Sequence, residues 1–405
     1  MEWNLPYLTD EHKSLIMLMK EFCEREVNVK ALNELADKPI PRNANWEYLR
    51  AQIPWDLLSK AHDAGLRQLT VPTAYGGGGY GSDLIALGAC AETAGYYGGQ
   101  MGRIFTIMWK PLADLEHFPT HLQEEVYPIF MEDRKTLLAA SITEPNSGSD
   151  MLIPNDEPGA AGMYFARREG DEWILNGDKQ WCEGAGIANY VILNVRTDPK
   201  GPLTKSITSF LFPTSTPGWS VRVNNMMGNE IFLNAQQHYE NCRISDRYRI
   251  TPVNGGYDAM RVRFAGVTIH LFAMLGWAEK TWENIRDYAK ARIQGGKPII
   301  QHNNVGMMIA EADVMLRAFK LLLYQNAHEC MAEGQNASPL GTFYLNYYEK
   351  TMINRLVEIG LDVYGGMGPQ KELDLEHWIR VHLSLSHGGS TGTLNLVKAS
   401  KLLAK

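Results

Sequence analysis

The stretch EWILNGDKQW, residues 172–181, decides the fold class of the central part of this chain. We interpret the residues on both sides of Asn176-Gly177 as strands, for which a period of two residues with one buried face is typical. Asn-Gly between two such runs favours a tight turn, because both residues tolerate positive φ angles. We therefore expect a β-hairpin whose turn is formed by Asn176 and Gly177.

Further strands are predicted downstream of this stretch. The runs NYVILNVR, SITSFLFP and WSVRV begin at Asn189, Ser206 and Trp219, and each is short and either apolar or alternating. Together with the hairpin, these runs indicate a middle β-domain over residues 138–250.

The part of the chain before the β-domain follows a helical period. The first helix has one apolar face, formed by Leu15, Met19 and Phe22, behind Thr9 or Asp10, and either of the last two residues can cap a helix. A second helix, WDLLSKAHDAGL, is expected to end near Gly65, a residue type that favours the left-handed position after a helix.

After Thr251, three long runs with aliphatic, Met and aromatic stripes return to the helical period. We interpret these stripes as the packed core of a helical bundle rather than as a cofactor-binding motif. The predicted fold class is therefore α+β, with an N-terminal helical domain over residues 1–137, the middle β-domain, and a C-terminal four-helix bundle over residues 251–405.

Composition limits the function of the chain. Its 405 residues are 45% apolar and 21% charged, as in an ordinary globular enzyme, and a net charge of −7 argues against nucleic acid as a partner. No run of about 18 apolar residues predicts a membrane span, and the N-terminus lacks the segments of a signal peptide. The five cysteines are scattered without a CxxC pair. We therefore expect a cytoplasmic protein with reduced thiols and no metal site.

Four motifs carry a resemblance to a known family. They are SITEPNSGSD from Ser141, WILNGDKQW from Trp173, RIQGGKP from Arg292 and VYGGMGP from Val363. In this order the motifs resemble the FAD-dependent acyl-CoA dehydrogenases, over nearly the whole chain from residue 9 to residue 402. RIQGGKP departs from the family, which usually has an aromatic residue where this chain has Gly295.

The resemblance implies bound FAD, an acyl-CoA substrate and a homotetramer in which each flavin is held partly by a neighbouring subunit. It also suggests an electron-transfer flavoprotein as the electron acceptor. Within one subunit, Trp181 matches the residue that covers the flavin, and Ile142 and Thr143 match the positions that bond its pyrimidine edge. Ser149 matches a residue that contacts the CoA arm. Trp181 is equally compatible with a place in the core of the β-domain.

Other matched positions serve a flavin from a second direction. Arg292 matches the arginine that reaches the diphosphate of the partner subunit's flavin, although a solvated helix end would explain it as well. Gly365 and Gly366 match a turn that lets the backbone approach the adenosine half of that flavin. Thr391 and Thr393, near the C-terminus, complete the predicted cofactor-binding set.

The general base of the family is missing from its usual place. In the dehydrogenases a glutamate removes the α-proton of the thioester, and counting from Arg380 places Gly389 at that position. Some members carry the base on the first helix of the bundle instead, where this chain has Gly266. A positioned general base contributes about 10²–10⁴ in rate. Either the base lies elsewhere or the reaction does not need one.

Two side chains are candidates for catalytic work. His387 lies two residues before Gly389, although a structural histidine is an equal alternative. Glu183 takes the place of a family threonine beside flavin N5, where its carboxylate would either tune the flavin or move a proton, unless it points into solvent. His382 is a further but weaker candidate.

Three interpretations of function remain open from the sequence. The first is an acyl-CoA oxidoreductase acting on an unusual thioester, and the intact TEP segment favours it. The second is a relative with other flavin chemistry on the same fold, either a desulfinase or a flavin-dependent monooxygenase. The third is a non-catalytic flavin-binding relative, which the retained FAD-contacting positions argue against.

Overall fold

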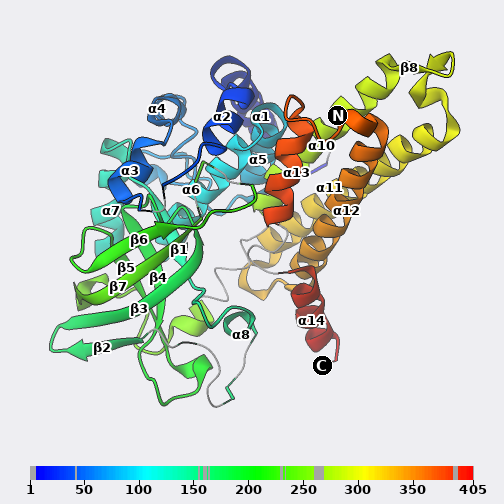
Figure 1. Cartoon of the computed structure of the whole chain (residues 1–405). Helices are drawn as coiled ribbons and strands as arrows, with labels where there is room; N and C mark the ends of the chain where they lie inside the picture. Colours follow the sequence, from blue (N-terminus) through cyan, green and yellow to red (C-terminus); the bar gives the residue numbers. More distant parts are fainter. Residues whose placement is uncertain are drawn as a thin grey trace. The chain divides into compact units, whose positions relative to one another are not determined.

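The computed structural model of the chain describes residues 6–41, 43–153, 156–157, 162, 165–228, 231–232, 234–259, 269–385 and 391–404. These residues form two compact units (Figure 1). Unit 1 consists of residues 1–37, 83–106 and 267–405, and unit 2 consists of residues 38–82 and 107–266.

The elements confirm the predicted order of helices, β-domain and helices. The helices before the sheet are α1 (Asp10–Glu26), α2 (Val29–Ala36), α3 (Trp46–Ala51), α4 (Trp55–Asp63), α5 (Leu84–Gly98), α6 (Met101–Leu115) and α7 (Thr120–Glu132). The middle elements are β1 (Leu138–Ser141), α8 (Ser149–Leu152), β2 (Phe165–Glu169), β3 (Glu172–Glu183), β4 (Tyr190–Arg196), β5 (Ile207–Pro213), β6 (Trp219–Val223) and β7 (Asn234–Ser245). The C-terminal elements are α10 (Ile269–Ala291), β8 (Ile293–Gln294), β9 (Lys297–Pro298), α11 (Asn303–Glu333), α12 (Leu340–Tyr364), α13 (Asp374–Leu385) and α14 (Gly392–Leu403).

Two of the predicted helix boundaries are confirmed in detail. Thr9 caps α1, because its hydroxyl accepts a hydrogen bond from the backbone N–H of His12 over 3.2 Å. Helix α4 ends at Asp63, and Gly65 follows in the left-handed region with φ of 78°. A glycine at this position ends the helix without the steric cost that a Cβ atom would add.

In unit 1, α5 packs very closely against α10. A Cβ atom on Gly95 would lie 2.1 Å from the carbonyl oxygen of Ala273, and one on Gly276 would lie 1.9 Å from the carbonyl oxygen of Glu92. These glycines allow the two backbones to approach closely. The buried ammonium of Lys320 on α11 donates hydrogen bonds to the carboxylates of Glu92 and Glu279, which joins α5, α10 and α11.

Unit 2 is built on a seven-stranded sheet. The strand order is β1-β4-β2-β3-β7-β6, with β5 paired to β4, and β3 and β7 form a long antiparallel pair (Figure 1). Trp173, Phe210 and Tyr239 contribute large rings to the buried apolar cluster of this sheet. The strands predicted from the runs beginning at Asn189, Ser206 and Trp219 correspond to β4, β5 and β6, so these three predictions are confirmed.

The predicted turn at Asn176-Gly177 is wrong. Both residues lie inside the continuous strand β3, where a β-bulge shifts its register against β7 and Gly177 has φ of 130°. The side-chain oxygen of Asn176 accepts a hydrogen bond from the backbone N–H of Asn241 over 2.9 Å. The chain instead turns between β2 and β3 at Gly170, which has φ of 60°. Pairing with β7 therefore outweighs the local preference of Asn-Gly for a turn.

Candidate functional site

A second bulge near the end of β3 displays Trp181. The register of β3 against β7 shifts between Lys179 and Cys182, and within this bulge Trp181 has φ of 59°. The left-handed conformation costs a residue other than glycine about 1–2 kcal/mol, and such strain is often found at functional sites. The side chain of Trp181 is 51% exposed. The interpretation of Trp181 as a core residue is therefore wrong, because the strand holds its ring toward the solvent.

The loop after β1 is joined to the strand beside this tryptophan. The backbone N–H of Gln180 donates a hydrogen bond of 2.8 Å to the carbonyl oxygen of Thr143. Thr143 is half-buried, and within the described residues neither its backbone N–H nor its hydroxyl has a hydrogen-bond partner. The structure thus places Ile142 and Thr143 next to the strand residues that precede Trp181, with unused donors at Thr143.

A buried ion pair lies beneath this junction. The Nζ atom of Lys179 lies 2.9 Å from Glu144 Oε1, and their side chains are 0% and 4% exposed. The same Nζ donates a hydrogen bond of 2.8 Å to the carbonyl oxygen of Ile142. Next to it, Gln237 on β7 donates from Nε2 to the hydroxyl of Ser141. The segment 141–144 is therefore fixed to the pair of strands β3 and β7 by charged and neutral hydrogen bonds.

Two further candidates lie on the same unit. Glu183 is the last residue of β3, is half-buried and pairs with Asn234 of β7. Gly184 follows it in the left-handed region with φ of 71°. Ser149 is the first residue of the four-residue helix α8 and is exposed. Both side chains are thus accessible to a ligand from outside.

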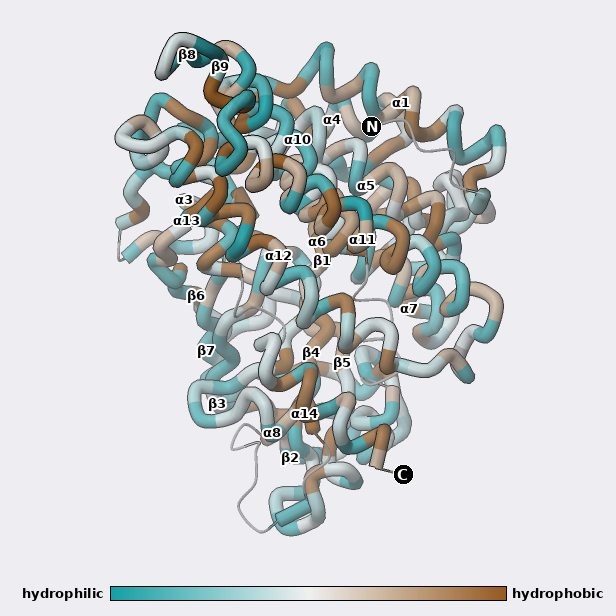
Figure 2. Tube along the Cα trace, turned by 90° about the vertical axis from the view of Figure 1, so that its right-hand side faces the viewer, coloured by the Kyte–Doolittle hydropathy of each residue, from teal (hydrophilic) through white to brown (hydrophobic). Residues whose placement is uncertain are grey.

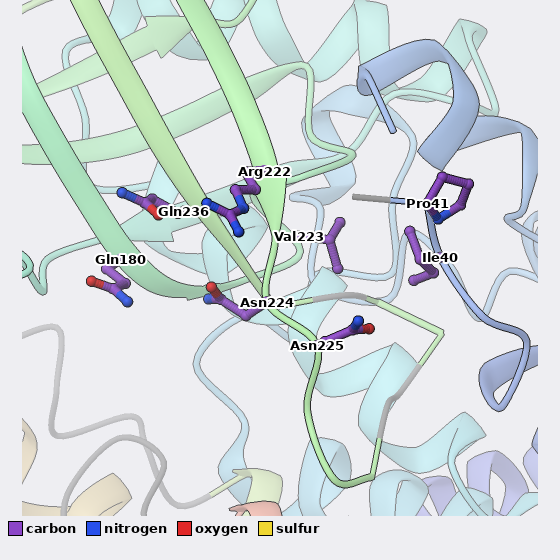
Figure 3. A pocket seen from close by; sticks show the side chains of 8 residues that line it. All are labelled: Ile40, Pro41, Gln180, Arg222, Val223, Asn224, Asn225 and Gln236. Atoms are coloured by element: carbon purple, nitrogen blue, oxygen red, sulfur yellow. The ribbon is translucent and has the colours of Figure 1, made fainter. Parts of the chain in front are cut away.

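The outer face of β3, β6 and β7 carries a polar cavity of about 400 Å³ (Figure 3). Arg222 and Gln236 are direct cross-strand neighbours on this face. None of the residues predicted to bind the cofactor lines this cavity, although Gln180 is the neighbour of Trp181 in the chain. Its lining consists of Ile40, Pro41, Gln180, Arg222, Val223, Asn224, Asn225 and Gln236.

In unit 1, Arg292 directly follows the last residue of α10. It is exposed, and within the described residues its guanidinium has no hydrogen-bond or ion-pair partner. Its backbone begins a two-stranded hairpin, in which Gly295 and Gly296 have φ of 61° and 80°. Two successive positive φ angles are typical of a tight hairpin turn. This explains glycine at position 295, where the family usually has an aromatic residue.

The Gly365-Gly366 turn follows α12. Gly365 has φ of 59°, and a Cβ atom on either glycine would meet no atom within 4 Å. Packing within the described chain therefore does not require Gly366, and the space beside the turn is open.

Thr391 is the N-cap of α14, and its hydroxyl accepts from the backbone N–H of Leu394 over 3.1 Å. Thr393 lies in the first turn of that helix and is exposed.

The candidates for the base fall largely outside the described residues. His387, Gly389 and Gly266 all lie there. His382 is described and lies on α13, where burial lowers the pKa of its imidazole to about 3. Both ring nitrogens of His382 are buried without a hydrogen-bond partner among the described residues. A neutral imidazole enclosed in this way is unsuited to proton exchange with a substrate.

The comparison with protein families decides the relationship. Residues 9–127, 139–242 and 254–397 match the N-terminal, middle and C-terminal domains of the acyl-CoA dehydrogenases. The chain belongs to the acyl-CoA dehydrogenase family. It is therefore an enzyme of a family of oxidoreductases that act on CH–CH groups, as the resemblance of the four motifs implied.

Individual relatives align over nearly the whole chain. The chain is 26% identical to the 3-(aryl)acrylate reductase of Clostridium sporogenes and 25% identical to a caffeyl-CoA reductase-Etf complex subunit of Acetobacterium woodii. Both alignments cover 98% of this chain and 100% of the relative. The solved butyryl-CoA dehydrogenase from Megasphaera elsdenii superposes with a TM-score of 0.83 at 20% identity, over 100% of both chains. This structural likeness supports the acyl-CoA dehydrogenase fold.

Sequence reasoning missed the buried pair of Lys179 and Glu144. The signal was present in the alternation of β3, because Lys179 lies an even number of residues from Trp173 and Leu175, whose side chains are buried in the apolar cluster of the sheet. A lysine predicted on an inward face of a strand requires a nearby carboxylate. Its partner lies 35 residues away in the chain.

Proposed function

We propose that this protein is an FAD-dependent oxidoreductase that acts on the bond between the α and β carbons of an acyl-CoA thioester. The observation that carries the proposal is the bulge that holds Trp181 toward the solvent next to a loop with unused donors at Thr143. Family membership favours this chemistry over the desulfinase, monooxygenase and non-catalytic alternatives.

The residues fit a flavin. The exposed ring of Trp181 offers an apolar face to a flat heterocycle, and the N–H and hydroxyl of Thr143 can donate to its polar edge. Ile142, whose carbonyl oxygen already accepts from Lys179, remains a proposed contact of the cofactor. The exposed guanidinium of Arg292 suits a diphosphate of a partner subunit's cofactor, and the open space at Gly365-Gly366 suits its adenosine half. Bound FAD supplies the acceptor or donor of a hydride. Thr391, Thr393 and Ser149 remain proposed contacts of the cofactor or of the CoA arm.

The absence of glutamate at positions 389 and 266 bears on the substrate. A thioester whose α-proton is already acidic does not require a strong base, and reduction of a conjugated double bond requires a proton donor instead. Two of the relatives are named as reductases of aryl acrylates and of caffeyl-CoA. We therefore propose a conjugated or otherwise activated acyl group and include the reductive direction. His387 and Glu183 are the proposed proton-handling groups.

The assembly is proposed to be a homotetramer. Met307, Val314 and Leu321 repeat every seven residues on α11 and are 71%, 65% and 46% exposed, and apolar residues recur along α11 and α12 (Figure 2). A stripe with this spacing suits packing against another helix, and we assign it to a second copy of the chain.

An electron-transfer flavoprotein is the proposed redox partner, because one relative is a subunit of an Etf complex. The five cysteines are free, and we propose a cytoplasmic location. No helix in the described part of the chain is long and apolar enough to cross a bilayer.

A visible spectrum and an anaerobic titration test the proposal. The purified protein should show a bound flavin spectrum, which saturated or aryl-substituted acyl-CoA should bleach in the oxidative direction. Chemically reduced protein should be reoxidised by aryl-acrylyl-CoA. Colourless protein that does not take up added FAD would contradict the proposed cofactor. Flavin-loaded protein that reacts with neither class of thioester would contradict the proposed substrate.

A further inference from the structure

We propose that Lys179 and Glu144 form a positioning pair that tunes the flavin-binding donor at Thr143 through the backbone. This proposal rests on the proposed function and names residues to which the sequence assigned no role. The pair lies in the interior of unit 2, where the side chains of Lys179 and Glu144 are 0% and 4% exposed.

Stability does not explain why this ion pair is buried. An ion pair in a protein interior is often no more stabilising than well-packed apolar residues, whereas loss of one partner leaves a costly buried charge. Stability alone therefore gives no strong reason for a buried ammonium at this point. Lys179 does something that an apolar residue could not do, because its Nζ also donates to the carbonyl oxygen of Ile142 over 2.8 Å.

One peptide group connects Lys179 with the donor at Thr143. The carbonyl oxygen of Ile142 and the N–H of Thr143 belong to the same planar unit, and the described residues contain no cis peptide bond. In a trans peptide these two groups point in opposite directions. The ammonium of Lys179 therefore lies on one side of the peptide, and the unused N–H of Thr143 is directed to the other side.

The ammonium of Lys179 polarises this peptide group. A hydrogen bond to the oxygen of an amide draws electron density toward that oxygen, so the N–H of the same amide becomes a stronger donor. A cationic donor has a larger effect than a neutral one. The N–H of Thr143 then binds more tightly to an acceptor that gains negative charge, as the polar edge of a flavin does on reduction. Lys179 thus stabilises the reduced state from behind the peptide, and Glu144 moderates its charge.

The position of the donor is fixed by the same residues. The carbonyl of Thr143 accepts from the N–H of Gln180 over 2.8 Å, and Glu144 and Ser147 exchange two backbone hydrogen bonds of 2.9 and 3.1 Å. The first of these bonds holds the loop on the strand that displays Trp181, and the other two fix the conformation of the loop itself. The donor and the aromatic cover of the proposed flavin site are therefore parts of one rigid junction.

The test compares midpoint potentials of the bound flavin in three variants. Lys179→Met removes the positive charge and should lower the potential, whereas Glu144→Gln leaves the positive charge unopposed and should raise it. The double variant should lie between the two single variants. A tenfold change in the preference for the reduced flavin corresponds to about 30 mV for a two-electron couple, and we expect shifts of at least this size.

Opposite signs are the decisive result, because mere loosening of the fold would shift both single variants in the same direction. If Lys179→Met does not fold, the double variant and Glu144→Gln still differ only at position 179, and the double variant should have the lower potential. Equal potentials, or shifts of one sign, would overturn the proposal. Wild-type protein unable to bind FAD would instead overturn the proposed function, so the two failures are distinguishable. The dissociation constant of oxidised FAD should be measured in parallel. It should change by a smaller factor than the dissociation constant of reduced FAD, which is calculated from the shift in midpoint potential.

Discussion

The backbone N–H of Gln180 donates to the carbonyl oxygen of Thr143 over 2.8 Å, and this bond ties the loop after β1 to the strand that bears Trp181. The two segments are far apart in the sequence, yet each supplies what the other lacks for binding a flat polar heterocycle. One provides an exposed aromatic face, and the other provides donors without partners among the described residues.

The strained backbone of Trp181 leads to a first prediction. With φ of 59°, Trp181→Gly should remove about 1–2 kcal/mol of conformational strain that Trp181→Ala retains. Urea unfolding of the FAD-free variants should therefore give a more stable glycine variant. Both variants should bind FAD more weakly than the wild type, because both lose the ring. If the glycine variant were no more stable than the alanine variant, the backbone at position 181 would not be strained.

Arg292 gives a second prediction. If its exposed guanidinium reaches the diphosphate of a partner subunit's flavin, Arg292→Ala should lose a charge-assisted hydrogen bond of about 1.5–3 kcal/mol. The dissociation constant of FAD should then rise by roughly 10–150-fold. Lys290→Ala is a matched control, because Lys290 is an exposed cation in the last turn of the same helix. Equal flavin retention in the two variants would contradict the proposed contact between Arg292 and the flavin diphosphate.

A third prediction concerns Glu183. If its carboxylate lies near flavin N5, Glu183→Thr should raise the midpoint potential, because a negative charge next to the reduced ring is removed. Glu183→Gln keeps the size of the side chain and should raise the potential in the same direction. Spectroelectrochemistry of the three proteins measures the effect. An unchanged or lower potential in both variants would mean that Glu183 points away from the ring.

A fourth prediction is a dependence of stability on pH. Burial raises the pKa of Glu349 on α12 to about 7, above the value of about 4.3 in an unfolded chain. The unfolded state therefore loses this proton first, and folding stability falls as the pH rises from about 4.5 to about 7. The free energy of unfolding of Glu349→Gln should not fall in this pH range. At pH 8 it should exceed the wild-type value by up to about 3 kcal/mol, and below pH 4 the two values should not differ for this reason.

Thermal unfolding across this pH range measures the effect. Glu358→Gln on the same helix is the control, because Glu358 is 64% exposed and pairs with Arg355. The difference in unfolding free energy between Glu358→Gln and the wild type should stay nearly constant between pH 5 and pH 8, whereas the difference for Glu349→Gln should grow. A stability difference for Glu349→Gln that is independent of pH would show that this carboxyl titrates normally.

Local patterns predicted those parts of the fold that depend on neighbours in the sequence. The cap at Thr9, the glycine after α4 and the strand beginning near Asn189 follow from side-chain chemistry and period alone. The turn at Asn176-Gly177 failed, because its preference for a turn competes with the ladder of hydrogen bonds to β7, which no local window contains. The burial of Lys179 was not predicted, although its even spacing from Trp173 was a signal for it, and its carboxylate partner depends on the path of a loop 35 residues earlier.

The candidate site shows the same division. Family motifs pointed to Ile142, Thr143 and Trp181, and the structure brings these residues to one junction. The positive φ of Trp181 could not be predicted, because it arises from a bulge in a paired strand and not from the residue type. His382 looked like a candidate for proton transfer, whereas its complete burial between aromatic rings makes it unsuitable.

The last prediction concerns the glycine at the usual position of the family's base. If Gly389 occupies that position, Gly389→Glu should place a carboxylate over the substrate face of the flavin and give dehydrogenation of simple acyl-CoAs, by up to about 10²–10⁴ in rate. A side chain added where glycine allows close packing can cost about 1–3 kcal/mol and reduce this gain. Gly266→Glu tests the other position that family members use. His387→Ala separates the roles, because loss of a proton-transferring histidine should reduce the native activity and flatten the limb of the pH profile near pH 6.5. A Gly389→Glu protein that keeps FAD and binds acyl-CoA, yet dehydrogenates no chain length, would mean that residues 387–391 do not correspond to the family's catalytic segment.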